Sequence, residues 1–411
     1  MHAFKCSAIA LALLGIGFSA SAAEVNMYGT YSVGAVYQDF RHQDGGNFTM
    51  SNGPTSLDQS LYGLQGKEDL GNGLYAGFQL EGGFNPDDGT LNAANTIFDR
   101  KARLFIGNED FEVTFGRFGN FVQAGTPYTV YGKLRANMTM TSMPGFAPAS
   151  ITYNPTFLSN VIAVRTNAKT GFFAQALYSN GSSNDEQNLD WSDRGKVAQV
   201  STGWVGQQLR LGTVISYETQ RHEPGKTPKH DDTLGVHLIA SYDFGGPAIS
   251  AVYYHGENDW RIGAAPDLNK FVPKEASDPS EKGLKSDALF LSAAYPMGQH
   301  HWSASLGALK VTWEGDMTGM KHDDGNVYMG GVLYRYKLSK RTTLYGAASY
   351  TRGTDLLADL PRLNQTFTTV GISHNFYELE HLRCFFDPLL APQFKRKLAL
   401  EQSSVRLAKV S

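Results

Sequence analysis

Charged side chains alternate with small or apolar residues in two short segments of this 411-residue sequence, around Glu81 and at residues 101–103. Lys101 and Arg103 alternate with small or apolar residues, and Glu81 lies between Leu80 and Gly82. Successive side chains of a β-strand point to opposite faces, so these charges would gather on one face, away from the apolar one. Charges around an aqueous passage raise the local concentration of the opposite ion, so the chemistry expected here is selection of ions by charge.

The sequence has no motif of a hydrolase, a metalloprotease or a nucleotide-binding site. Gly-x-Ser-x-Gly, His-Glu-x-x-His and the Walker loop are all missing, and the 11 histidines are scattered. We therefore expect no catalytic residue, no metal site and no cofactor. With 36 Lys and Arg against 39 Asp and Glu, the chain also lacks the basic excess typical of a nucleic-acid-binding protein.

The elements that must position the charges are long strands with period-two alternation. The pattern is clear in residues 25–38 and 74–84 and returns in residues 210–217, 234–244, 248–255, 288–296, 302–313, 327–336, 343–351 and 366–376. Seven short turns alternate with eight long connections, which requires sixteen strands with both chain ends on one side. Short turns on one side and long loops on the other are the connectivity of a bacterial outer-membrane β-barrel.

The apolar face of the strands indicates which kind of barrel forms. A soluble barrel turns this face inward, but sixteen strands enclose an interior too wide for side chains to fill. The apolar face must therefore meet lipid and the polar face line a water-filled lumen, and closure of the sheet satisfies every backbone amide. The alternative is core packing in a β-sandwich. The fold prediction is all-β, a sixteen-stranded antiparallel transmembrane β-barrel over residues 23–376.

Both ends of the chain depart from the strand pattern. Residues 1–22 combine Lys5, a short apolar stretch and Ala20-Ser21-Ala22, which are the features of a cleaved secretory signal peptide. A buried N-terminal helix is the alternative interpretation. Residues 377–411 lose the alternation and contain 6 Lys and Arg against 4 Asp and Glu. This atypical C-terminal extension is either a periplasmic addition or read-through sequence, and we favour the second.

Residues 60–84, SLYGLQGKEDLGNGLYAGFQLEGGF, resemble the Gram-negative general porins. The resemblance continues through residues 100–107 and 115–119 and ends with residues 369–376. It implies a homotrimeric diffusion pore in the outer membrane, with the third long loop, residues 120–158, folded into the lumen as the constriction. The implied partners are small hydrophilic solutes and ions, outer-membrane lipid and lipopolysaccharide, and the barrel-assembly machinery, which would read Phe376 as its signal.

The sequence departs from this family in three places. The third loop of the family usually carries acidic residues, but residues 119–158 contain no Asp or Glu, and their only charges are Lys133 and Arg135. Leu61 stands where the family usually has a wall arginine. The family ends at a terminal phenylalanine, whereas here 35 residues follow Phe376.

We predict a pore constriction that is cationic or near neutral. Its predicted members are Glu81, Lys101, Arg103, Lys133 and Arg135. The alternative is that these charges are solvated rim residues without effect on selectivity. The barrel as a whole contains 29 Lys and Arg against 35 Asp and Glu, which would favour cations weakly if the constriction is wide. By alternation along its strand, the side chain of Arg117 would not face the lumen. It would therefore either cap loop carbonyls or reach into the constriction.

The third loop also contains the aromatic residues Phe121, Tyr128, Tyr131 and Phe146. They would either form a track for sugar rings or anchor the loop against the inner wall, and we favour the anchor. Passive diffusion of small hydrophilic solutes and ions is therefore the leading hypothesis. A sugar-preferring porin, and an outer-membrane barrel acting mainly as a structural protein or adhesin, are the alternatives.

Overall fold

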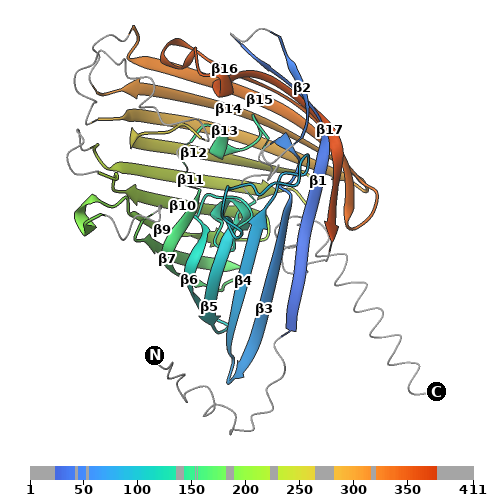
Figure 1. Cartoon of the computed structure of the whole chain (residues 1–411), viewed down its shortest axis with the longest axis vertical. Coiled ribbons are helices and arrows are strands. Elements are labelled where there is room, and N and C mark those ends of the chain that lie inside the picture. The colour runs from blue at the N-terminus through green and yellow to red at the C-terminus, as the bar shows by residue number, and fades with distance from the viewer. Residues whose placement is uncertain are drawn as a thin grey trace, which may run out of the picture.

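The computed structural model describes residues 24–41, 45–51, 55–135, 143–152, 154, 156–181, 189–222, 230–263, 282–315 and 321–376. Antiparallel strands form one sheet that closes on itself, because β17 pairs with β1 (Figure 1). The strands are β1 (Glu24–Phe40), β2 (Asn47–Met50), β3 (Leu61–Gly71), β4 (Leu74–Gly83), β5 (Lys101–Gly107), β6 (Phe111–Gly119), β7 (Phe157–Thr166), β8 (Gly171–Ser179), β9 (Val197–Val205), β10 (Leu209–Glu218), β11 (Thr233–Asp243), β12 (Ala248–Asp259), β13 (Leu284–Met297), β14 (His300–Trp313), β15 (Asp324–Lys337), β16 (Thr342–Gly353) and β17 (Asn364–Phe376).

Two of these segments, β2 and β3, are pieces of one barrel strand. Residues 47–50 pair with residues 35–38 of β1, and residues 61–67 pair with residues 24–30 of the same strand. The barrel therefore has sixteen strands, which confirms the fold prediction. The sequence assigned residues 41–56 to a loop, and β2 corrects that assignment. A four-residue strand is too short for alternation to distinguish it from the flanking polar loop.

Between β2 and β3 the chain leaves the sheet toward the barrel interior. The Ser56 and Ser60 hydroxyls donate to the Ser32 carbonyl at 3.2 and 3.1 Å, which satisfies a backbone group that the interrupted ladder leaves open. Leu57 is buried in a cluster with residues of the third loop and of the β15–β17 wall, among them Phe146 and Phe367. A second chain segment therefore occupies the inner side of the barrel beside the third loop.

The two faces of the wall differ in polarity along the alternation. Large apolar side chains such as Leu104, Val200, Leu238, Leu306 and Val370 are exposed on the outer face. Polar side chains at the intervening positions lie on the inner face. Because the sheet closes through β1, which pairs with β17 on one side and with β2 and β3 on the other, the wall can stand in hydrocarbon with its amides paired. Separately, the described residues include no helix that is long and apolar enough to span a bilayer.

Short turns join the strands at one end of the barrel. The β3–β4 turn holds three consecutive residues at positive φ, Gly71 (83°), Asn72 (52°) and Gly73 (78°). Glycine adopts this left-handed backbone without a Cβ clash, and Asn tolerates it better than most residues, so the sequence Gly-Asn-Gly suits the turn. The long connections leave from the other end, and Figure 1 shows the third one inside the ring of strands.

The third loop includes a short helix, α1 (Val130–Lys133), and a 3-10 turn, η2 (Pro148–Ser150). The Thr129 hydroxyl accepts a hydrogen bond from the Gly132 amide and caps α1. The loop contacts inner-face side chains on both sides of the barrel: the Phe121 amide donates to Gln199 of β9, and Ser349 of β16 donates to the Pro144 carbonyl. The other short helices are η4 (Trp191–Asp193), η6 (Asp355–Leu357) and η7 (Pro361–Leu363).

Candidate functional site

A buried carboxylate on β4 lies at the centre of the charged inner wall. Glu81 pairs in register with Lys101 of β5, and its Oε2 lies 2.7 Å from the Lys101 Nζ. Its Oε1 accepts from the Arg100 Nε at 2.8 Å, and the Tyr28 hydroxyl donates to Oε2 at 2.8 Å. The side chains of Glu81 and Lys101 are only 1% and 2% exposed. Both oxygens are thus fully engaged, as a buried carboxylate requires.

A second carboxylate, Glu112 of β6, continues the network along the wall. The Arg103 Nη1 lies 3.5 Å from the Glu112 Oε1, and the Arg165 Nη2 of β7 lies 3.0 Å from the same oxygen. The Arg103 Nε also donates to Gln79 at 3.0 Å. We call this set the wall cluster; its members are Glu81, Arg100, Lys101, Arg103, Glu112 and Arg165. Four cations here face two carboxylates.

Tyr128 of the third loop packs against the wall cluster. Its ring stacks on Phe118 and Phe121, with centroids 5.3 and 6.2 Å apart, and the Arg165 guanidinium lies 4.8 Å from its centroid. Its hydroxyl donates to Thr114 at 3.1 Å. Burial raises the pKa of Tyr128 to about 12, so this hydroxyl keeps its proton at neutral pH. The loop is held to the charged wall by stacking, a cation–π contact and hydrogen bonding together.

The predicted loop aromatics are buried. Phe121, Tyr128 and Tyr131 are each at most 1% exposed, and Phe146 is fully covered against the opposite wall. The Tyr131 hydroxyl lies 2.8 Å from the Nδ1 of His237 on β11. None of these rings presents a free face to a solute, so their geometry fits the anchoring interpretation and not a sugar track.

Lys133 and Arg135 lie beyond the wall cluster, near the short-turn end of the barrel. The Lys133 Nζ donates to the Ala168 carbonyl in the β7–β8 turn at 3.0 Å. The Arg135 Nη1 lies 2.7 Å from the Asp243 Oδ2 at the end of β11, and the Arg210 Nη1 donates to the Lys133 carbonyl at 3.4 Å. We call Lys133, Arg135, Arg210 and Asp243 the loop cluster. Three cations here face one carboxylate.

Lys133 has an unusual proton affinity for a lysine. Burial, together with the nearby positive charge of Arg165, lowers the pKa of Lys133 to about 8. Its ammonium is half-buried and lies 4.7 Å from the Phe173 ring centroid. The group is therefore largely charged at neutral pH and loses its charge in mild alkali.

Arg117 joins neither cluster. Its Nε donates to the Asp99 carbonyl at 2.8 Å and its Nη1 donates to the Ser159 hydroxyl at 2.7 Å. A register shift between Gly116 and Phe118 lies at this point of β6. Arg117 therefore bonds the chain just before β5 and a side chain of β7, and not a carbonyl of the third loop.

The structure brings three predicted residues together in the wall cluster, namely Glu81, Lys101 and Arg103, and separates Lys133 and Arg135 from them. Sequence reasoning missed Arg100, Glu112, Arg165 and Arg210. Glu112 and Arg165 follow the exposed Phe111 and Val164, so alternation places them inward and could have found them. Arg100 precedes its strand, so no local pattern marks it.

The remaining predicted features lie at the ends of the described chain. Phe376 is the last residue of β17 and pairs with Gly29 of β1. The signal peptide, residues 1–22, and the C-terminal extension, residues 377–411, lie outside the described residues. Within the part of the chain that the structure describes, no three His, Cys, Asp or Glu side chains are grouped so that they could hold a metal ion.

The family is decided by comparison with known proteins. The model of the Gram-negative porin family matches residues 7–356. The chain belongs to this family. Curated relatives of this porin include an outer membrane porin protein of Bordetella pertussis, which is 27% identical over 415 residues, covering 90% of this chain and 100% of that protein. Outer membrane porin protein 32 of Delftia acidovorans is 27% identical over 359 residues, covering 85% of this chain and 90% of that protein.

Solved structures share the fold of this porin. The anion-selective porin from Comamonas acidovorans aligns with a TM-score of 0.60 at 21% identity, covering 86% of this chain and all of that one. OmpT of Vibrio cholerae, in its trimer form, aligns with a TM-score of 0.57 at 13% identity, covering 86% of this chain and 99% of that one. At these identities the likeness concerns the fold.

The porin is thus an outer-membrane channel for passive diffusion of small hydrophilic solutes and ions, and it is not an enzyme. Its short turns face the periplasm and its long loops face outward, as in other barrels of this membrane. The two charged clusters lie on the inner face of this channel, beside its third loop.

Proposed function

We propose that this porin prefers anions, and that the cations around its third loop cause the preference. The observation that supports the proposal is the charge of the loop and its wall. The wall cluster has four cations for two carboxylates, and the loop cluster has three for one. The loop itself contributes Lys133 and Arg135 and no acid between residues 119 and 158.

The acidic excess of the whole barrel does not oppose this proposal. Charges separated by more than about 10 Å of 0.1 M salt solution are largely screened, so distant acids contribute little at the constriction. Cations that line a narrow passage act on a permeating ion at short range. A porin of similar fold, from Comamonas acidovorans, is described as anion-selective, which agrees with the proposal.

The zero-current potential in a tenfold KCl gradient across a planar bilayer tests the proposal. Chloride that crosses faster than potassium makes the dilute side negative. We expect a ratio of chloride to potassium permeability above about 3, because one net charge about 6 Å from the ion is worth roughly 0.7 kcal/mol in water. A ratio below 1 would contradict the proposal. It would instead support the weak cation preference that the total charge of the barrel favours.

We further propose that the channel is a homotrimer, embedded in outer-membrane lipid and lipopolysaccharide. The solved trimer form of OmpT, which has the same fold, supports the assignment. Native mass spectrometry of the full-length protein extracted in mild detergent would give three times the protomer mass. A monomer mass across all detergents tested would refute it.

We also propose that residues 1–22 are removed on export and that Phe376 is the signal for the barrel-assembly machinery. Phe376 lies in β17, the strand that closes the barrel against β1, which supports the second assignment. N-terminal sequencing of the exported protein should begin at Ala23, and any later or earlier start would correct the cleavage site. Deletion of residues 377–411 should raise the yield of folded barrel, and an unchanged yield would count against Phe376 as the signal.

A further inference from the structure

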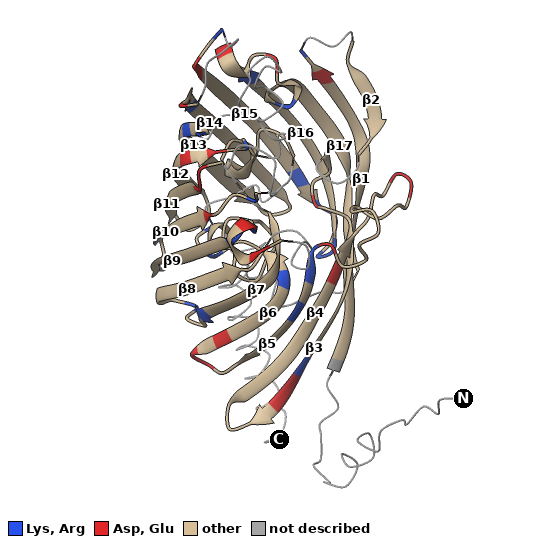
Figure 2. Cartoon of the chain, turned by 60° about the vertical axis from the view of Figure 1, so that its left-hand side comes forward, with Lys and Arg blue, Asp and Glu red and all other residues tan. Residues whose placement is uncertain are grey.

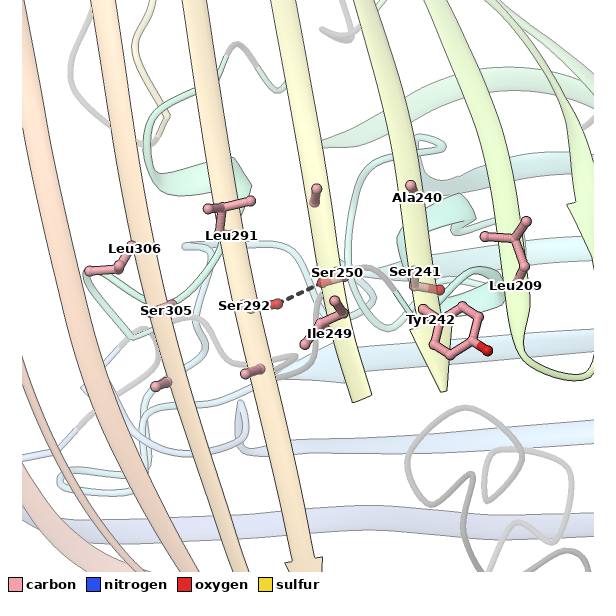
Figure 3. Close-up of a pocket in the computed structure, with 13 residues that line it drawn as sticks. Leu209, Ala240, Ser241, Tyr242, Ile249, Ser250, Leu291, Ser292, Ser305 and Leu306 are labelled. Atoms are coloured by element: carbon pink, nitrogen blue, oxygen red, sulfur yellow. Dashed lines mark hydrogen bonds between the residues drawn. The ribbon is translucent and has the colours of Figure 1, made fainter. Parts of the chain in front are cut away.

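An apolar groove of about 410 Å³ crosses the outer face of β10–β14 (Figure 3). Ala240, Ala251, Ala293 and Ala304 are the small residues that make it, and larger side chains such as Leu306 border it. Ala240 pairs with Ala251, and Ala293 pairs with Ala304, so small residues lie side by side on neighbouring strands. The four alanines therefore leave a depression in an outer face that otherwise has large apolar side chains.

The groove continues into a second hollow of about 620 Å³ over β8–β13. The two hollows share Ala240 and Ala251, and the second adds Gly203 and Gly212 beside Trp204. In Figure 3 the Ser250 and Ser292 hydroxyls of the first hollow bond to each other, at 2.6 Å. These serines are buried at the inward positions of their strands, so the surface offered to a ligand is apolar, with room for two neighbouring hydrocarbon chains.

Both hollows lie in the periplasmic half of the wall. Ala304 is four residues from the start of β14 at His300, which is about 13 Å along the strand. Trp302 lies between Ala304 and His300 on the same face of β14, and its ring centroid is 4.6 Å from that of Tyr334. The His300 Nδ1 lies 2.7 Å from the Tyr334 hydroxyl. This cluster has the composition of the aromatic belt that marks a membrane interface.

The periplasmic rim differs in charge between the two sides of the barrel. The turns after β3 and β5 are acidic, with Glu68, Asp69, Glu109 and Asp110, as the red hairpin ends in Figure 2 show. The rim at the β15–β16 turn, beside the β14 edge of the groove, is basic, with Lys337, Lys340 and Arg341. An anionic headgroup at the rim would therefore be attracted to the side that also has the groove.

We propose that this face binds one anionic phospholipid of the periplasmic leaflet. The acyl chains lie in the two hollows, the glycerol backbone lies at the Trp302–Tyr334 belt, and Lys340 and Arg341 attract the phosphate. Acyl chains gain no hydrophobic free energy by moving from bilayer to protein, so van der Waals packing in the hollows and the rim charges supply the selectivity. Each basic residue near the headgroup contributes about fivefold in affinity.

Lipid titrations followed by native mass spectrometry of the full-length porin test the proposal. Dioleoyl phosphatidylglycerol should bind at one site per protomer, about tenfold or more tighter than dioleoyl phosphatidylcholine. Lys340→Gln with Arg341→Gln should remove this preference and leave phosphatidylcholine binding unchanged. Ala293→Leu with Ala304→Leu fills the groove and should weaken both lipids about threefold or more, because the chains lose their packing surface.

Two matched substitutions serve as controls. Ala198→Leu enlarges an outward alanine at the extracellular end of β9, and Lys169→Gln removes an exposed cation from the β7–β8 turn. Neither should change lipid affinity. Equal weakening by the groove variant and Ala198→Leu would overturn the proposal in favour of unspecific annular lipid. Loss of the oligomer in the groove variant would also overturn it, because the face would then be a contact between protomers.

Discussion

The two charged clusters of the lumen differ in how their charges are held. In the wall cluster, Glu81 is 1% exposed and accepts from both Arg100 and Lys101, so its charge is buried and compensated; only Arg165, at the edge of that cluster, is more exposed, at 23%. In the loop cluster, the side chains of Arg135 and Asp243 keep 17% and 16% exposure. A buried and paired charge contributes to the structure of the wall, whereas a partly exposed one meets passing ions. Charge counts along a pore wall therefore overstate how many of the charges act directly on permeating ions.

The largest effect should come from Glu81→Gln. The substitution leaves Arg100 and Lys101 buried side by side without their carboxylate, which costs about 3–5 kcal/mol of the free energy of unfolding. Urea unfolding of the porin refolded in lipid vesicles, followed by tryptophan fluorescence, measures this loss. The substitution removes one negative charge, so any surviving channel should remain anion-preferring.

Asp243→Asn is the matched variant in the loop cluster. It also removes one carboxylate from an ion pair, but this pair is in contact with water, so we expect a loss of about 1 kcal/mol or less. Equal destabilisation by the two substitutions would show that the distinction between the clusters is wrong.

Arg135→Gln should have the next largest effect, on selectivity. It removes a partly exposed cation and its ion pair with Asp243, so the ratio of chloride to potassium permeability should fall about threefold. Lys169→Gln, in the exposed β7–β8 turn, removes the same charge outside the loop cluster and should leave the ratio unchanged. A ratio that responds equally to both substitutions would assign selectivity to the mouth of the pore.

The smallest effect concerns pH. The pKa of Lys133 is lowered to about 8, so its charge is present below pH 8 and is lost as the pH rises through that value. The anion preference should decline, by less than about twofold, between pH 7 and pH 9. In Lys133→Met the zero-current potential should stay constant over this range. A preference that rises with pH in the unmodified porin would contradict the assignment.

Alternation and turn composition were enough to predict the barrel. They placed the strands because lipid on one face and water on the other impose a strict period of two. They missed β2, where only four residues pair with β1, and they did not predict that residues 55–60 leave the sheet. Such an excursion depends on contacts with Phe146 and Phe367, which are distant in sequence, and no local pattern records them.

The candidate site was predicted less completely, because it depends on register. The alternation of side chains along each strand placed Glu81, Lys101 and Arg103 inward. Only the pairing of β5 with β6 and of β6 with β7 brings Glu112 between Arg103 and Arg165. The place of Lys133 and Arg135, at the β7–β8 turn and the end of β11, follows from the path of the third loop. That path is set by tertiary contacts such as the one between Tyr131 and His237.

The central claim is that the partly exposed cations of the loop cluster give this porin its anion preference. The most direct test is the zero-current potential in a tenfold KCl gradient, measured side by side for the unmodified porin and for Lys133→Gln with Arg135→Gln and Arg210→Gln. The account predicts a negative dilute side for the unmodified channel and a potential near zero or reversed for the triple variant. The same anion preference in both channels would contradict it.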